Sequence, residues 1–220
     1  MQKILFGVSI FLFMLYCHVF ALQKGVIEYS IPIDYSLIDE KSLNDHAEII
    51  YSEYTTSTDE ILKKGLLLEL LSDYSILSNI NKDNPLYFVR LGIVYDKLGK
   101  DRWAKSNFCR SSNLVPNYAY AFYSFGNYFF ERNEYRKALK EYMRAYQYGF
   151  DKHYENLYQI GIIYEKLGDF SLAIKYFKLA QGCKDSEELT KKILLLEEML
   201  EKKSLYNQKR GVIYEYFKAY

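Results

Sequence analysis

The feature that most constrains the fold of this 220-residue chain is a glycine that recurs at nearly equal intervals. Gly126 follows Gly92 by 34 residues, and Gly161 follows Gly126 by 35 residues. Each of the three lies among apolar residues at helical spacing, where glycine is less favourable than alanine by roughly 1 kcal/mol. A constant period of this length is typical of stacked helix pairs, so the sequence predicts a helical-repeat protein.

Each copy of the repeat contains two segments with helical periodicity and a short turn between them. The first segments carry apolar residues at spacings of three and four: Phe88, Leu91 and Tyr95; Phe122, Phe125 and Phe129; Leu157, Ile160 and Tyr164. The turns hold residues that tolerate the left-handed backbone conformation ending many helices, namely Gly99, Asn133 and Gly168. These three features together predict a helix, a turn and a second helix in every copy.

The second segments place a large ring between two small residues on one helix face. These trios are Ala104, Phe108 and Ser111; Ala138, Tyr142 and Ala145; Ala173, Phe177 and Ala180. Small residues at positions i−4 and i+3 from a ring favour close approach of another helix. We therefore expect Gly92, Gly126 and Gly161 to mark where each first helix is crossed tightly by its neighbour.

This pattern resembles the tetratricopeptide repeat family over residues 85–184. The third copy matches best, with Leu157, Ile160, Gly161 and Tyr164 in the opening of the first helix and a Gly-Asp-aromatic turn at 168–170. Other positions depart from the family pattern: Asp101 replaces a turn aromatic, and Phe150 and Asp185 replace prolines. The resemblance implies an all-α fold, a right-handed solenoid of helix pairs with about three units at 85–118, 119–153 and 154–184.

A repeat array needs atypical covers for its apolar ends. Apolar stripes at helical spacing predict an N-terminal helical cap at 37–84 and a C-terminal capping helix at 185–204. Outside the caps, alternation of apolar and polar residues predicts an extended segment within 22–36. The tail, 205–220, is similarly rich in β-forming residues, and each of these two segments either lies along the solenoid or binds a partner.

Residues 1–21 have the pattern of a secretory signal peptide. Lys3 is followed by an apolar run that ends at Val19, Phe20 and Ala21. We expect cleavage after Ala21 and export to the periplasm, the exterior or the outer face of a membrane. An uncleaved N-terminal membrane anchor is the alternative. Cys109 and Cys183 lie in second helices two repeats apart, so we expect two unpaired thiols, buried or partly so.

The composition gives little support for catalysis or nucleic-acid binding. The formal net charge is +1, and the chain has only three histidines. No Cys/His spacing suits zinc, and no phosphate-binding glycine loop or Gly-x-Ser-x-Gly motif occurs. We therefore expect no catalytic residue, no metal, no cofactor and no small-molecule substrate, and the chain is not predicted to be an enzyme.

The family resemblance implies a concave binding surface lined by the first helices. The expected partner-binding groove comprises Tyr120, Tyr123, Asn127, Phe130, Tyr158, Ile162, Val89 and Ile93. Some family members hold a peptide carboxylate there with basic residues and asparagine, but here Val89, Ile93 and Glu155 occupy that region. For Tyr123 and Tyr158, packing between adjacent helices is the alternative role.

These inferences favour a non-catalytic protein–protein interaction scaffold, exported or membrane-anchored, that binds a peptide or protein partner in an aromatic groove. The alternative is an RNA-binding helical-repeat protein, since pentatricopeptide arrays have a similar period. RNA-binding arrays use basic and polar base-reading side chains. The near-neutral charge and the aromatic groove argue against that alternative, so no nucleic-acid partner is expected.

Overall fold

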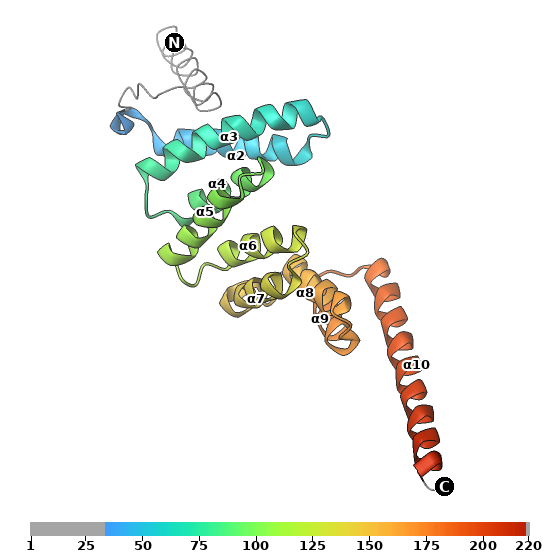
Figure 1. The fold of residues 1–220 in the computed structure, drawn as a ribbon. Helices are drawn as coiled ribbons and strands as arrows, with labels where there is room; N and C mark the ends of the chain where they lie inside the picture. The colour runs from blue at the N-terminus through green and yellow to red at the C-terminus, as the bar shows by residue number, and fades with distance from the viewer. Residues whose placement is uncertain (1–33, 219–220) are drawn as a thin grey trace. The chain divides into compact units, whose positions relative to one another are not determined.

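The computed structural model describes residues 34–218 of the chain, and the side chains up to residue 208. The segment 1–21 and most of the segment 22–36 lie outside the described residues. Between residues 34 and 218, every regular element is helical, which confirms the all-α helix-pair solenoid. The chain forms two compact units, Met1–Pro116 (unit 1) and Asn117–Tyr220 (unit 2), whose helices are labelled in Figure 1.

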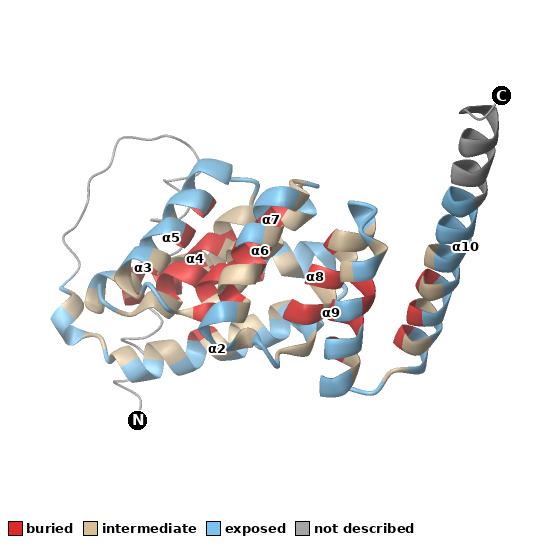
Figure 2. Ribbon diagram, turned by 90° about the horizontal axis from the view of Figure 1, so that it is seen from below, coloured by how far each residue is buried: buried red, intermediate tan, exposed pale blue. Residues whose placement is uncertain are grey.

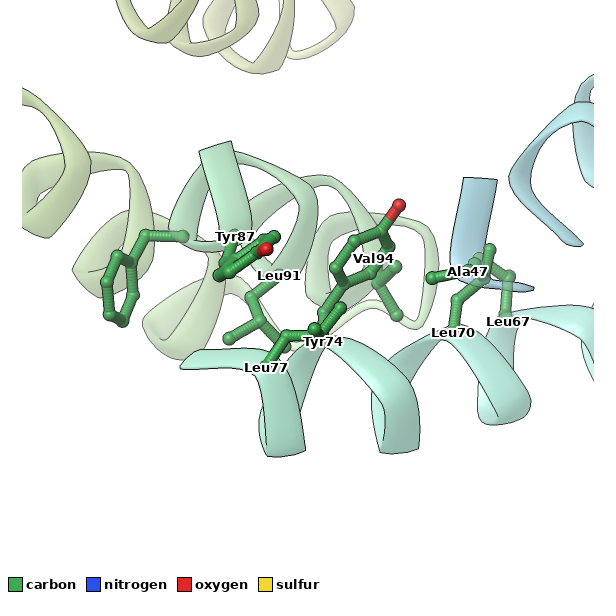
Figure 3. Packing of buried hydrophobic residues seen from close by; sticks show 9 residues of the cluster. Ala47, Leu67, Leu70, Tyr74, Leu77, Tyr87, Leu91 and Val94 are labelled. Atoms are coloured by element: carbon green, nitrogen blue, oxygen red, sulfur yellow. The ribbon is translucent and has the colours of Figure 1, made fainter. Parts of the chain in front are cut away.

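Unit 1 contains α2 (Glu40–Thr56), α3 (Glu60–Ile80), α4 (Pro85–Lys97) and α5 (Asp101–Leu114). Three of these helices begin at a side chain that accepts hydrogen bonds from free backbone amides: Asp39, Asp59 and Asn84. Their apolar faces meet in one core, which Figure 3 shows from close by. Tyr74 and Leu77 of α3 pack there with Leu91 of α4, so the helices before the first repeat cover its apolar end.

Two carboxylates hold α2 against its neighbours in unit 1. Glu48 accepts hydrogen bonds from the Tyr74 hydroxyl and from the Arg90 guanidinium, both at 2.9 Å, and so connects α2 to α3 and α4. Asp73 is buried on α3 and lies 3.0 Å from Nδ1 of His46 on α2. Burial raises the pKa of Asp73 to about 6, although the hydrogen bond and the charge of His46 oppose that rise.

Unit 2 contains α6 (Ala119–Glu131), α7 (Tyr135–Ala145), α8 (Tyr154–Lys166), α9 (Phe170–Cys183) and α10 (Glu187–Lys218). A short helical turn, η2 (Tyr146–Phe150), follows α7 and ends through Gly149, whose φ is 118°. The helices pack as the pairs α6–α7 and α8–α9, and α10 packs on α9. This unit therefore holds the second and third repeats.

The turns inside the three repeats have the backbone conformation that the sequence predicts. Gly99, Asn133 and Gly168 have φ values of 69°, 59° and 78°, all in the left-handed region. In each case the turn ends the first helix and lets the second helix fold back. Asn133 is the only non-glycine residue with positive φ among the described residues. Asparagine reaches this conformation more readily than most residues.

The repeat glycines lie against the rings of the second helices. A β-carbon on Gly92, Gly126 or Gly161 would lie 2.6–2.7 Å from ring atoms of Phe108, Tyr142 and Phe177 respectively. Real β-carbons do not approach other atoms so closely, so a side chain would hold the two helices apart. The flanking small residues Ala104, Ala138 and Ala173 are completely buried. The close crossing predicted at these glycines is confirmed, and the crossing helix belongs to the same repeat.

Up to residue 208, the buried residues of α10 all lie in its first half. Figure 2 shows its buried residues on the side facing α9, and these are Leu189, Ile193 and Leu196. Beyond them Leu205 and Tyr206 are 50% and 64% exposed. Within residues 34–218, no helix combines the length and the hydropathy needed to cross a membrane.

For both segments that we expected to be extended, the expectation is wrong in the part that the structure describes. The tail 205–220 is not strand-like, because α10 continues to Lys218. A helix that is already nucleated gains one hydrogen bond for each added residue, which outweighs a context-dependent β propensity. At the other end, Tyr35–Leu37 forms a 3₁₀ turn, because the Asp34 carboxylate accepts a hydrogen bond from the backbone amide of Ser36.

Cys109 and Cys183 are free thiols, and both are exposed. The expectation that they are buried is therefore wrong. Cys109 follows the buried Phe108 directly, so its helix position points away from the packed face. Cys183 is the last residue of α9, where its thiol lies 3.4 Å from the carbonyl oxygen of Leu179.

Candidate interaction surface

The predicted binding residues of unit 2 lie on the first helices of its two repeats. Spacings of three, four and three residues place Tyr120, Tyr123, Asn127 and Phe130 along one face of α6. The corresponding positions of α8 follow the same spacing. We call these eight residues the inner face of unit 2: Tyr120, Tyr123, Asn127, Phe130, Glu155, Tyr158, Ile162 and Glu165. Seven of them are partly buried and Glu155 is exposed.

Tyr123 is held in the middle of an aromatic cluster. Its ring centroid lies 5.9 Å from that of Tyr142, 5.8 Å from Phe150 and 5.3 Å from His153. These partners come from α7, the η2 turn and the residue before α8. Burial raises the pKa of the Tyr123 hydroxyl, and a hydrogen bond with Asn127 opposes the rise. The ring therefore packs within the second repeat, up to the residue that precedes α8, which favours the packing role for this residue.

Asn127 fixes the tyrosines around it. Its Oδ1 accepts a hydrogen bond of 2.7 Å from the hydroxyl of Tyr142, a side chain with no exposed surface. Because Asn127 also bonds to Tyr123, its amide holds the aromatic cluster in place. An amide that already makes hydrogen bonds to Tyr142 and Tyr123 orients these neighbours and is less available to bind a peptide backbone.

Tyr120 and Phe130 lie at the two ends of α6 and keep part of their rings accessible. Tyr120 makes an edge contact with Tyr118, with centroids 6.2 Å apart. Phe130 makes an edge contact with Tyr135 at 5.7 Å. Both rings therefore flank the fixed cluster of Tyr123, and both residues are partly exposed.

On α8, Tyr158 stacks on Tyr154 at 5.8 Å and lies 5.6 Å from the ring of Phe177. Ile162 is half-buried one turn further along the helix. Tyr158 thus contributes both to the packing of the third repeat and to its surface.

The two predicted binding residues of unit 1 differ from each other. Val89 has no exposed surface, so it is a core residue and its assignment to a binding surface is wrong. Ile93, one turn later on α4, remains half-buried. Spacing alone places both on one face, but only the packed structure separates them.

Sequence reasoning missed the part played by Phe150 and His153. Their rings stack at 4.2 Å with an angle of 8° between the planes. Asn156, which has no exposed surface, donates hydrogen bonds to the carbonyl oxygens of Tyr142 at 3.2 Å and Phe150 at 3.4 Å. The signal for this arrangement was Phe150 itself, an aromatic residue where the repeat pattern has proline.

The described residues hold no group of three or more histidine, cysteine or acidic side chains arranged to bind a metal ion. What the inner face of unit 2 offers is partly exposed aromatic surface and negative charge. Aromatic side chains of this kind are frequent at protein interfaces.

Comparison with known proteins supports the fold. No protein-family model and no curated protein matches the sequence. Among solved structures, the chain is similar to PilF of Pseudomonas aeruginosa, with a TM-score of 0.61 and 11% identity over 77% of this chain and 73% of that one. It is also similar to a MamA structure, with a TM-score of 0.55 and 19% identity over 73% of this chain and 83% of that one. Both are helical-repeat proteins of the tetratricopeptide type, and at these identities the likeness shows the fold alone.

Proposed function

We propose that this chain, which has the tetratricopeptide-repeat fold, is a non-catalytic scaffold that binds a peptide or protein partner at the inner face of unit 2. The observation that carries the proposal is the arrangement on α6. Two partly exposed rings, Tyr120 and Phe130, flank the ordered cluster around Tyr123. Solenoids of this kind use the surface formed by successive repeats for binding.

The energetics of such a surface favour aromatic anchors. Binding energy at interfaces concentrates in a few central residues, among which tyrosine is enriched. The Tyr142–Asn127–Tyr123 bonding fixes the base of the surface before a partner arrives, so less side-chain freedom is lost on binding. The chemistry fits an extended or helical peptide with bulky apolar side chains.

We further propose that the protein acts outside the cytoplasm, because residues 1–21 have the pattern of a signal peptide. N-terminal sequencing of the protein from its native cells tests this. A mature chain that begins at Leu22 supports export with cleavage. A chain that still begins at Met1 supports the anchored alternative instead.

A matched pair of double variants tests the binding surface. The partner is first recovered with the full-length chain from native cell envelopes and then titrated against purified variants. Tyr120→Ala with Phe130→Ala should weaken binding by on the order of 2 kcal/mol or more. The helical circular dichroism signal should be unchanged. The control is Trp103→Ala with Tyr206→Ala, which removes two exposed rings outside this face. Equal affinities of the two double variants would rule out the inner face as the binding surface.

A further inference from the structure

We infer that the inner face of unit 2 recognises a positively charged peptide segment, in which lysine or arginine accompanies apolar side chains. This inference rests on the proposed function and names the chemical class of its ligand. It follows from how charge is divided between the first and second helices of this unit, and from the surroundings of one carboxylate, Glu155.

The first helices of unit 2 are acidic and the second helices are basic. On α6 and α8, three acids (Glu131, Glu155, Glu165) oppose one lysine (Lys166), a net charge of −2. On α7 and α9, six cations oppose the single acid Glu141, a net charge of +5; the cations are Arg136, Lys137, Lys140, Arg144, Lys175 and Lys178. The inner face itself contains two acids and no cation. A partner of the opposite sign is favoured there, and a like-charged partner is repelled.

The other acid of the inner face and the single acid of the second helices are already paired with cations of the chain. Glu165 pairs with Lys192 of α10 at 2.8 Å, and both side chains are 29% exposed. Glu141 pairs with Arg144 at 2.9 Å. These carboxylates serve the fold, so they leave little negative charge for a ligand.

Glu155 differs because no lysine or arginine among the described residues pairs with it. Its carboxylate is 57% exposed in the first turn of α8, and its neighbour is Nδ1 of His153 at 3.4 Å. Burial is the main cause of the raised pKa values of Tyr123 and Tyr154, and the negative charge of Glu155 adds to both. Glu155 therefore lies close to the aromatic cluster of Tyr123 and to the stacked pair Tyr154–Tyr158.

A cation beside both a carboxylate and aromatic rings gains from each. The chain uses cation–ring contacts in this unit: the Arg132 and Arg144 guanidinium groups lie 3.8 Å from the ring centres of Tyr128 and Phe122. A partner lysine or arginine near Glu155 would have the same kind of surroundings, with an added ion pair. The same carboxylate repels a peptide's C-terminal carboxylate, so an internal basic segment is favoured over an acidic chain end.

The test uses two fluorescein-labelled synthetic peptides with blocked ends. They share their leucine and phenylalanine positions, and one has lysine wherever the other has glutamate. Affinities for the full-length chain are measured by fluorescence anisotropy at low and at physiological salt. The variants are Glu155→Lys and a control with the same charge change, Glu201→Lys, an exposed position on α10.

The lysine peptide should bind at least about tenfold more tightly than the glutamate peptide at low salt, with a smaller ratio at physiological salt. Glu155→Lys should weaken the lysine peptide about three- to tenfold, and Glu201→Lys should change it less than twofold. Equal or tighter binding of the glutamate peptide, or equal effects of the two variants, would overturn the inference. If both peptides bind equally and both lose affinity in the Tyr120→Ala, Phe130→Ala variant, the proposed surface stands and only its charge preference is wrong. If binding of the lysine peptide is untouched by that double variant, the surface itself is wrong.

Discussion

Gly126 lies so close to the ring of Tyr142 that a β-carbon on it would be 2.6 Å from Cδ1 and Cε1. Tyr142 cannot easily move, because it is completely buried and its hydroxyl donates a hydrogen bond to Asn127. The same relationship joins Gly92 to Phe108 and Gly161 to Phe177. The repeat glycine is therefore required by packing within each helix pair, although glycine is unfavourable in a helix.

Gly126→Ala should destabilise the protein by roughly 1–3 kcal/mol, because the added methyl group overpacks the Tyr142 ring. Gly65→Ala is the matched control, since a β-carbon at Gly65 on α3 would meet nothing within 4 Å. That control should be neutral or stabilise by up to about 1 kcal/mol through helix propensity. Urea unfolding followed by circular dichroism measures both. If the two variants are equally stable, the close crossing at Gly126 does not contribute to stability.

Asn133 should be replaceable by glycine but not by a β-branched residue. Its φ of 59° is reached freely by glycine, whereas most other residues are strained there by roughly 1–2 kcal/mol. Asn133→Gly loses only an exposed hydrogen bond from the Tyr135 hydroxyl, so its midpoint of thermal unfolding should change little. Asn133→Val should lower the midpoint clearly. If valine is tolerated as well as glycine, the turn does not require a left-handed residue.

Two neighbouring leucines of α10 should differ sharply in their effect on stability. Leu196 is 3% exposed and packs towards α9, whereas Leu195 is 57% exposed. Leu196→Ala should lower the free energy of unfolding by about 2 kcal/mol or more, the usual effect of truncating a buried leucine. Leu195→Ala should change it by less than about 0.5 kcal/mol. Guanidinium unfolding of both variants checks this. Similar losses in the two would contradict the docking of α10 through this stripe.

The buried carboxyl of Asp73 should make stability depend on pH in a defined direction. Its pKa of about 6 in the folded protein exceeds the ordinary value of 3.8, so the folded state binds this proton more tightly than the unfolded state. The contribution of Asp73 to stability should therefore rise as pH falls through 6. Relative to Asp73→Asn, the wild type should gain about 1 kcal/mol between pH 7.5 and pH 5.

The measurement is the unfolding free energy of both proteins across that pH range. Asp45→Asn, at an exposed position on the same helix as His46, controls for the loss of any carboxylate. The facing groups His46 and Glu69 are present in all three proteins. A difference between wild type and Asp73→Asn that stays constant with pH would show that the carboxyl titrates normally.

The sequence alone determined the features that depend on contacts within one repeat. The glycine period, the ring between small residues and the left-handed turn residues each span 35 residues or fewer, and helix pairs are local structures. The packing of Gly126 on Tyr142 and the conformation of Asn133 therefore followed from spacing.

The tertiary structure decided the features that depend on what lies next to a helix face. Spacing put Val89 among the surface residues, but neighbouring side chains cover it completely. Residue type suggested that Asn127 could bind a peptide, but Tyr142 and Tyr123 already use its amide. The tail of α10 remained helical because it continues a packed helix, which its own residues do not reveal. Burial, hydrogen-bond partners and helix length depend on which side chains and helices come together in the fold, so only the folded molecule fixes them.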